Sequence, residues 1–157
     1  MTFFNGKYAG QALSLLRIIT ALLFIQHGTA KLFDFPHMNL PPDIMGIPVG
    51  GIGALELVGG LLVLIGLFTR PAAFILAGEM AVAYFMVHAS KGAYPALNGG
   101  EPAILFCFAF LLFAAAGAGP WSVDAMRGED DEPGVEGYAA PGGERQYRPE
   151  DFGDTVI

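Results

Sequence analysis

Cysteine and the common cofactor-binding motifs are almost absent from this 157-residue chain. The single cysteine, Cys107, cannot form an internal disulfide, a CxxC redox pair, a thiolate zinc site or an iron–sulfur cluster. Its place inside an apolar run is typical of a small core residue. No GxGxxG follows a predicted strand, and there is no P-loop and no nucleophile elbow. The sequence therefore offers no nucleotide site and no hydrolytic triad.

Metal-binding spacings are also lacking. No HxxxH or ExxH pattern presents two ligands from one helix, although His27, His88, Glu56 and Glu101 supply nitrogen and oxygen atoms. Haem ligation by a facing pair of histidines is a weaker candidate. We therefore expect no metal and no cofactor held by this chain alone.

Charge is scarce in most of the chain, where long apolar runs take its place. Charged residues make up 15% of the sequence and hydrophobic residues 54%, with a mean hydropathy of +0.51. Four apolar segments, residues 10–33, 49–68, 71–90 and 101–118, approach the roughly 20 residues that a helix needs to cross a bilayer. They predict an all-α, integral membrane four-helix bundle within residues 1–126. A soluble protein with buried helices is the alternative, which this composition disfavours.

The first segment has to be distinguished from a cleaved secretory signal. It is longer than the apolar stretch of a signal peptide, Arg17 interrupts it, and no small-residue cleavage site follows it. We expect a retained span.

The C-terminal tail differs from the rest of the chain. Ten acidic residues against three basic ones after position 120 account for the whole net charge of −7. Residues 127–157 are rich in Gly, Pro and acids, so we expect a disordered tail, since such a composition buries too little surface to offset chain entropy. The alternative is that its aromatic residues order on a cytosolic partner. The acidic surplus argues against nucleic acid as a partner.

The distribution of Lys and Arg predicts the orientation in the membrane. Four spans place both termini on one side, and only Lys31 and Lys91 fall on the other side. The positive-inside rule then makes both termini cytoplasmic. Loops 34–48 and 89–100 face outward, and the Pro-rich, apolar loop 34–48 is expected to cover the outer mouth of the bundle. The basic residues assigned to the cytoplasmic side are Lys7, Arg17, Arg70, Arg127, Arg145 and Arg148.

Ionisable residues lie inside three of the four apolar segments, where a charge that faces lipid is costly. At 1.5 Å per residue, His27 and Glu56 both lie about 10 Å from the outer ends of their helices, and Arg17 and Glu79 about 10 Å from the inner ends. We therefore predict an outer ion pair of Glu56 with His27 or Lys31, and an inner buried ion pair of Arg17 with Glu79.

The outer layer contains the larger number of polar residues and is the predicted ligand-binding cavity. Sheltered carboxylates and imidazoles are the groups that proton-coupled redox chemistry and transport use. The alternative is that both layers are structural and only fix helix register. On an ideal helix His88 lies about 180° from Glu79, so both cannot face the bundle axis. The predicted cavity residues are His27, Lys31, Glu56, His88 and Glu101.

Four sequence runs occur in an order that a known family shares. They are RIITALLFIQHGTAKL at residues 17–32, GALELVGGLLVLIGLFTR at 53–70, NGGE at 98–101 and GAGPWSVD at 117–124. Over about residues 10–126 the chain resembles the DoxX family of small bacterial membrane proteins, which is related to the small subunit of thiosulfate:quinone oxidoreductase. The tail lies outside the resemblance. The polar and glycine positions of the family fall on Arg17, Gly28, Lys31, Glu56, Gly66, Glu101, Ser122 and Asp124.

The resemblance implies a multi-pass protein of the bacterial inner membrane that works with an oxidoreductase. We expect a membrane subunit of a quinone-linked electron-transfer system, in which a partner subunit supplies the redox cofactor and a quinone binds with that partner. The alternatives are a small-molecule or proton carrier and a purely structural membrane anchor of a larger complex. Membrane lipid, an oxidoreductase subunit and a second copy of the chain are the expected partners.

Overall fold

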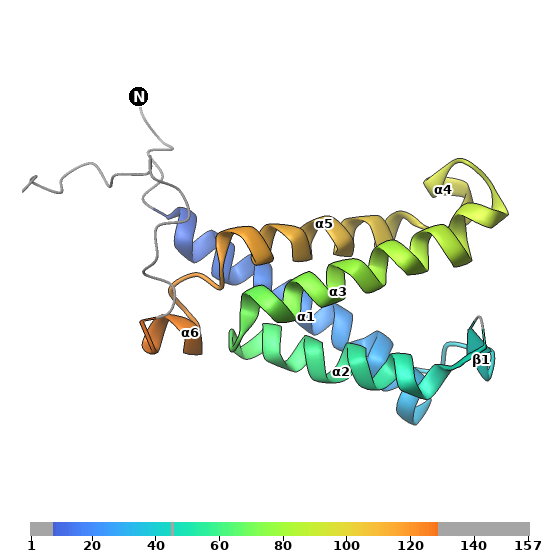
Figure 1. Cartoon of the computed structure of the whole chain (residues 1–157), viewed down its shortest axis with the longest axis horizontal. Helices are drawn as coiled ribbons and strands as arrows, with labels where there is room; N and C mark the ends of the chain where they lie inside the picture. Colours follow the sequence, from blue (N-terminus) through green and yellow to red (C-terminus); the bar gives the residue numbers. More distant parts are fainter. Residues whose placement is uncertain (1–7, 45, 129–157) are drawn as a thin grey trace, which may run out of the picture.

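A computed structural model of the protein describes residues 8–44 and 46–128, so most of the predicted acidic tail, and the prediction that it is disordered, lie outside the described residues. The described chain is helical almost throughout. Its four long helices run alongside one another in Figure 1: α1 (Ala9–Phe33), α2 (Val49–Ile65), α3 (Thr69–Ala83) and α5 (Glu101–Ala116).

Short elements connect the long helices. Loop 34–48 contains a small antiparallel hairpin of β1 (Asp43–Ile44) and β2 (Ile47–Pro48), in which Asp43 pairs with Pro48. Helix α3 continues into a π-helical segment, η1 (Tyr84–His88), and a 3₁₀ turn, η2 (Ala89–Lys91). The remaining helices, α4 (Pro95–Asn98) and α6 (Val123–Met126), are each one turn long.

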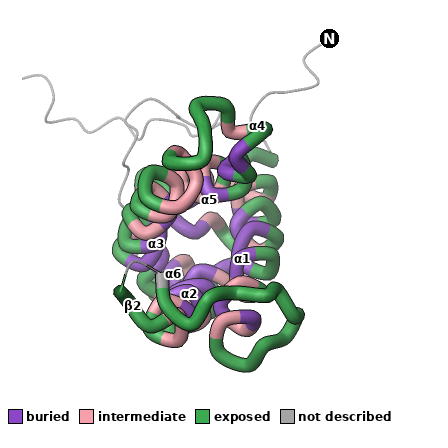
Figure 2. Tube along the Cα trace, turned by 90° about the vertical axis from the view of Figure 1, so that its right-hand side faces the viewer, coloured by how far each residue is buried: buried purple, intermediate pink, exposed green. Residues whose placement is uncertain are grey.

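The long helices form two closely packed pairs. Helix α1 packs mainly on α2, and α3 mainly on α5, with fewer contacts between the pairs. Viewed along the helices, their buried faces turn toward a common centre (Figure 2). Helix α4 and the β1–β2 hairpin lie at one end of the molecule, and α6 lies at the opposite end, beside the turn between α2 and α3 (Figure 1). We call these the hairpin end and the α6 end.

Two glycines allow the backbones of α1 and α2 to approach closely. A Cβ atom on Gly28 would lie 2.7 Å from the backbone nitrogen of Leu57, and one on Gly53 would lie 2.6 Å from the Cβ atom of Lys31. Both distances are too short for a side chain unless the neighbouring atoms move. This contact brings Lys31, one turn beyond Gly28, next to α2.

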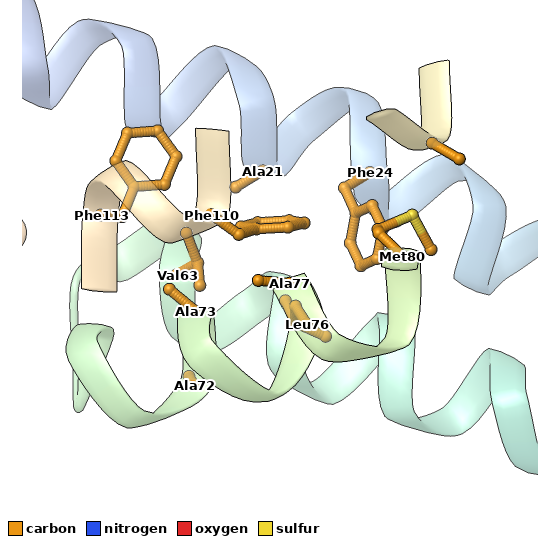
Figure 3. Close-up of a cluster of buried hydrophobic side chains, with 11 residues drawn as sticks. Ala21, Phe24, Val63, Ala72, Ala73, Leu76, Ala77, Met80, Phe110 and Phe113 are labelled. Atoms are coloured by element: carbon orange, nitrogen blue, oxygen red, sulfur yellow. The ribbon is translucent and has the colours of Figure 1, made fainter. Parts of the chain in front are cut away.

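The centre of the molecule is filled by aromatic and small residues (Figure 3). Phe24, Phe110 and Phe113 are completely buried, and the rings of Phe24 and Phe110 meet edge to face with centroids 4.8 Å apart. Ala73 and Ala77 of α3 face them, which brings α3 close to α5. The aromatic cluster separates the polar residues of the α6 end from those of the hairpin end.

The outward faces of the long helices are apolar. Large hydrophobic side chains there are about half exposed or more, such as Phe74 at 66%, Leu105 at 70% and Phe108 at 67%. A soluble surface rarely carries such continuous apolar area. By length and composition α1 and residues 69–91 are able to cross a membrane, whereas α2 and α5 are shorter apolar helices of 17 and 16 residues.

Candidate functional site

Arg17 is completely buried at the α6 end and binds backbone carbonyl groups. Its Nη1 donates to the carbonyl oxygens of Val63 and Leu64 at 2.5 Å, in the last turn of α2. Its Nε donates to the carbonyl of Ala118 at 2.8 Å, and its Nη2 to that of Trp121 at 2.5 Å. A cation suits this position, because the last carbonyls of a helix lack intrahelical partners and carry partial negative charge.

The predicted ion pair between Arg17 and Glu79 is therefore wrong. The guanidinium group is bound by carbonyls at the α6 end, and neither carboxylate oxygen of Glu79 has a hydrogen-bond partner among the described residues. The depths of Arg17 and Glu79 were matched on a predicted start of the third helix at Pro71. Helix α3 begins at Thr69, two residues earlier, so Glu79 lies about 3 Å further from the α6 end than the prediction assumed.

Asp124 completes the α6-end cluster. Its two carboxylate oxygens accept hydrogen bonds of 2.9 Å from the backbone N–H groups of Phe68 and Thr69, which open α3. Its own backbone N–H donates to the carbonyl of Gly66 at 2.8 Å. A carboxylate at a helix N-terminus satisfies unpaired donors and complements the helix dipole. The residues after α5 are thus bound to the turn between α2 and α3.

Lys31 and Glu56 form an ion pair at the hairpin end, between α1 and α2. Only 1% of the Glu56 side chain and 12% of the Lys31 side chain are exposed. Of the two partners predicted for Glu56, the structure selects Lys31. Glu56 Oε1 accepts from the Lys31 ammonium group, while Glu56 Oε2 is buried without a partner among the described residues.

A cavity of about 510 Å³ lies next to this ion pair, on the side that faces the hairpin end. Residues from all four long helices line it, and Met38, Leu40, Pro41 and Asp43 of loop 34–48 form one of its walls. The predicted residues that line it are His27, Lys31, Glu56 and His88. Most of the remaining lining is apolar, with Met80, Ala83, Val87, Ala103 and Phe106 among its members.

The two histidines reach the cavity from different elements. His27 of α1 packs edge to face on the ring of Phe106, with centroids 5.8 Å apart. His88 lies at the end of η1, and its Nδ1 is 3.1 Å from the carbonyl oxygen of Asn98. Because a carbonyl only accepts, Nδ1 carries the proton in this contact. In a neutral imidazole, Nε2 is then a hydrogen-bond acceptor.

His88 and Glu79 face different hollows, in agreement with the expectation that both cannot face the bundle axis. His88 ends the π-helical segment Tyr84–His88 and lines the cavity, whereas Glu79 of α3 does not. Buried Asn98 supports the turn that holds His88, because its side chain binds the backbone of Gly92 at 2.8 Å and of Gly100 at 2.7 Å.

Glu101 is the predicted cavity residue that the structure places elsewhere. It is exposed at the first position of α5 and is not among the residues that line the cavity, although its neighbours Pro102 and Ala103 are. A carboxylate in the first turn of a helix interacts favourably with the helix dipole. Sequence spacing correctly put Glu101 at the hairpin end but could not tell an inward position from an outward one.

Glu79 faces a second hollow, which sequence reasoning missed. The hollow is a groove of about 390 Å³ between α2 and α3. The lining residues that it shares with the cavity are Lys31, Glu56, Met80, Ala83 and Val87. Glu79 is near enough to Lys31 and Glu56 to interact with both electrostatically. The Lys31–Glu56 pair thus lies between the cavity and the α2–α3 groove.

Comparisons with known proteins agree with this chain's motifs. Residues 12–89 match the DoxX family. The chain is 47% identical over 123 residues to an uncharacterized protein of Haemophilus influenzae, which covers 75% of this chain and 92% of that protein. It is 29% identical over 119 residues to inner membrane protein YqjF of Escherichia coli, covering 70% and 87% of the two chains. No solved structure matches. These findings confirm the resemblance: the chain belongs to the DoxX family and is a membrane protein.

Proposed function

We propose that all four long helices cross the inner membrane as one bundle, with both termini in the cytoplasm. The apolar outward faces of α1, α2, α3 and α5 support this arrangement, because they form a belt suited to acyl chains. Arg17 and Arg70 lie toward the α6 end and Lys31 and Lys91 toward the hairpin end, which makes the hairpin end periplasmic by the positive-inside rule.

Labelling of introduced cysteines tests this topology. In a chain with Cys107→Ser, a cysteine at Asn39 is expected to react with a membrane-impermeant maleimide in intact cells, and a cysteine at Gly128 only after lysis. The reverse pattern, or labelling of both positions in intact cells, contradicts the proposal.

The chain's proposed function is that of a membrane subunit of a quinone-linked oxidoreductase, which binds the quinone head group in the cavity. The observation that supports it is the convergence of His27, Lys31, Glu56 and His88 on a largely apolar cavity of about 510 Å³. Such a volume, with a few convergent polar groups, suits a small ring-shaped head group. The Lys31 ammonium group is a donor for a carbonyl oxygen of a quinone, and Nε2 of neutral His88 is an acceptor for a hydroxyl of the quinol.

This division of labour needs a partner protein. Reduction of a quinone to a quinol takes up electrons and an equal number of protons. The partner supplies the electrons from its own redox cofactor, while the polar cavity residues of this chain deliver protons to the quinone oxygens. The shared Lys31–Glu56 pair, buried beside two imidazoles, is a suitable proton relay.

A carrier of small molecules or protons is the second candidate. It is favoured by one observation: the cavity and the α2–α3 groove meet at the same ion pair, so a ligand or proton that passes the pair moves between the hairpin end and the outward-facing groove. A structural anchor for a larger complex is the third candidate, and it needs neither hollow to be occupied.

Binding of decylubiquinone to the full-length chain in nanodiscs tests the first candidate. The quinone is expected to bind saturably. Lys31→Met, which removes the ammonium donor, and Glu56→Gln, which removes the carboxylate that positions it, are each expected to weaken binding about tenfold. Glu101→Gln is the matched control, because Glu101 lies at the same end outside the cavity lining. Unsaturable binding, or equal binding by all variants, rejects a quinone site. Proton or solute flux across sealed vesicles without quinone would favour the carrier.

A further inference from the structure

The α2–α3 groove is chemically different from the cavity on the other side of the ion pair. Its apolar wall includes Leu55, Ile75 and Val82, whose side chains are 41%, 55% and 55% exposed. Because these residues belong to the outward faces of α2 and α3, the groove opens sideways between the two helices. A ligand dissolved in the surrounding apolar phase reaches it without passing the hairpin end.

The inner wall of the groove carries an excess of carboxylate oxygens. Glu56 and Glu79 both line it, and the one cation among its described lining residues is Lys31. Lys31 binds Glu56 Oε1, which leaves Glu56 Oε2 and both oxygens of Glu79 buried without hydrogen-bond partners among the described residues. Only 1% of the Glu56 side chain is exposed, so bulk water does not hydrogen-bond to its unpartnered oxygen.

When Glu56 and Glu79 are both ionised, the three unpartnered acceptors carry one negative charge that Lys31 does not offset, and this defines the group that fits between them. A primary ammonium group has three N–H donors and one positive charge. A quaternary ammonium has no donor, and none of the groove's lining residues is aromatic and able to hold one by cation–π contact. Calcium and magnesium need about six or more oxygen ligands, so beside two carboxylates most of the shell would be water, which the apolar remainder of the groove lining does not hydrogen-bond.

We propose that the α2–α3 groove is a binding site for a membrane-soluble primary amine, with its ammonium group between Glu56 and Glu79 and its apolar chain against Leu55, Ile75 and Val82. The site lies on the other side of the Lys31–Glu56 pair from the proposed quinone cavity, with which it shares that pair, and the proposal does not depend on whether a quinone binds in the cavity. Charge-assisted hydrogen bonds in a dry groove are the strong kind, and they satisfy the three buried oxygens together.

Calorimetric titration of the full-length protein in dioleoylphosphatidylcholine nanodiscs tests the proposal. n-Decylammonium is the probe, and decanol and decyltrimethylammonium are matched probes that lack the charge and the N–H donors respectively. Decylammonium is expected to bind saturably. After the heat measured with empty nanodiscs is subtracted, its affinity is expected to be at least about tenfold higher than that of either matched probe. Equal binding of the three probes, or no saturable binding of decylammonium, overturns it; in the latter case the surplus charge is neutralised by a proton.

Variants place the binding event in the groove. Glu79→Gln is expected to weaken decylammonium binding about tenfold or more while decylubiquinone binding stays unchanged. Val82→Trp fills the groove and is expected to block the amine, whereas Val58→Trp, at an equally exposed position of α2 outside the groove lining, is the control. Unchanged amine affinity in Glu79→Gln or Val82→Trp overturns the assignment. A failure of quinone binding alone leaves the amine site standing.

Discussion

The two ends of the molecule use buried polar groups in opposite ways. At the α6 end, Arg17 and Asp124 bind backbone groups that the helix ends leave unpaired, and the contacts are short and dry. At the hairpin end, Lys31 and Glu56 bind each other beside two hollows, and buried oxygens of Glu56 and Glu79 stay unpartnered among the described residues. Buried polar groups that are satisfied by backbone build the fold, whereas groups held next to empty space are available to a ligand.

The largest effect is expected from Arg17→Leu. It leaves the carbonyls of Val63, Leu64, Ala118 and Trp121 buried without the guanidinium, so it is expected to lower the free energy of unfolding by more than about 3 kcal/mol. Unfolding in mixed micelles with rising dodecyl sulfate, followed by circular dichroism, measures it.

Arg70→Leu is the matched control for Arg17→Leu. Arg70 also donates to carbonyls at the end of a helix, those of Ala114 and Ala115, but it is only partly buried. A cost of about 1 kcal/mol or less is expected. Equal costs for the two variants would show that the buried position of Arg17 adds nothing.

Asp124→Asn is expected to lower the free energy of unfolding by less than Arg17→Leu does. The amide keeps one acceptor oxygen but replaces the other with a donor, so only one of the two N–H groups of Phe68 and Thr69 stays bound. The expected cost is about 1–2 kcal/mol in the same unfolding assay. A variant as stable as the parent would remove Asp124 from the α6-end cluster.

The ion pair at the hairpin end is expected to matter less to stability than to ligand binding. Lys31→Met and Glu56→Gln each leave one buried group uncompensated, while the double variant removes both. The double variant is therefore expected to be at least about 1 kcal/mol more stable than the sum of the single effects predicts. Strict additivity would mean that the two side chains do not interact.

The smallest expected effect concerns loop 34–48. Hydrogen bonds from His37 to the Asp34 carboxylate and to Asn39 raise the pKa of His37 above 6.5. The contact with Asp34 is strongest while the imidazole is charged and weakens as the pH rises through that pKa. Nuclear magnetic resonance titration of His37 is expected to show a downward shift of its pKa in Asp34→Asn; an unchanged value would exclude the contact.

The sequence predicted the helices well because their ends carry local signals. Glycine in a left-handed conformation at Gly66 ends α2, and Pro102 follows the start of α5, so the predicted spans differ from the helices by only a few residues. Matching depths placed Glu56 at the level of His27 and left His27 and Lys31 as its candidate partners, of which the structure selects Lys31. In each case the information lies in residue types and spacings along one helix.

Predictions that depended on direction around a helix were less successful. Arg17 binds carbonyl oxygens, which every residue has, so no residue type identifies its partners in advance. Glu101 was predicted to line the cavity but is exposed at the first position of α5, and spacing along the chain does not reveal which way it points. Ser122 and Asp124 entered through the family resemblance alone; their roles at the start of α6 and α3 needed the fold.

The contacts of Arg17 have a consequence for biogenesis. Its guanidinium joins α1 to Ala118 and Trp121, which are more than a hundred positions later in the chain. After synthesis of α1 and α2, the guanidinium of Arg17 has the carbonyl acceptors of Val63 and Leu64, but those of Ala118 and Trp121 have not yet been synthesised. The first hairpin of helices is thus an unfinished intermediate, and chains released before position 118 lack the acceptors that complete it.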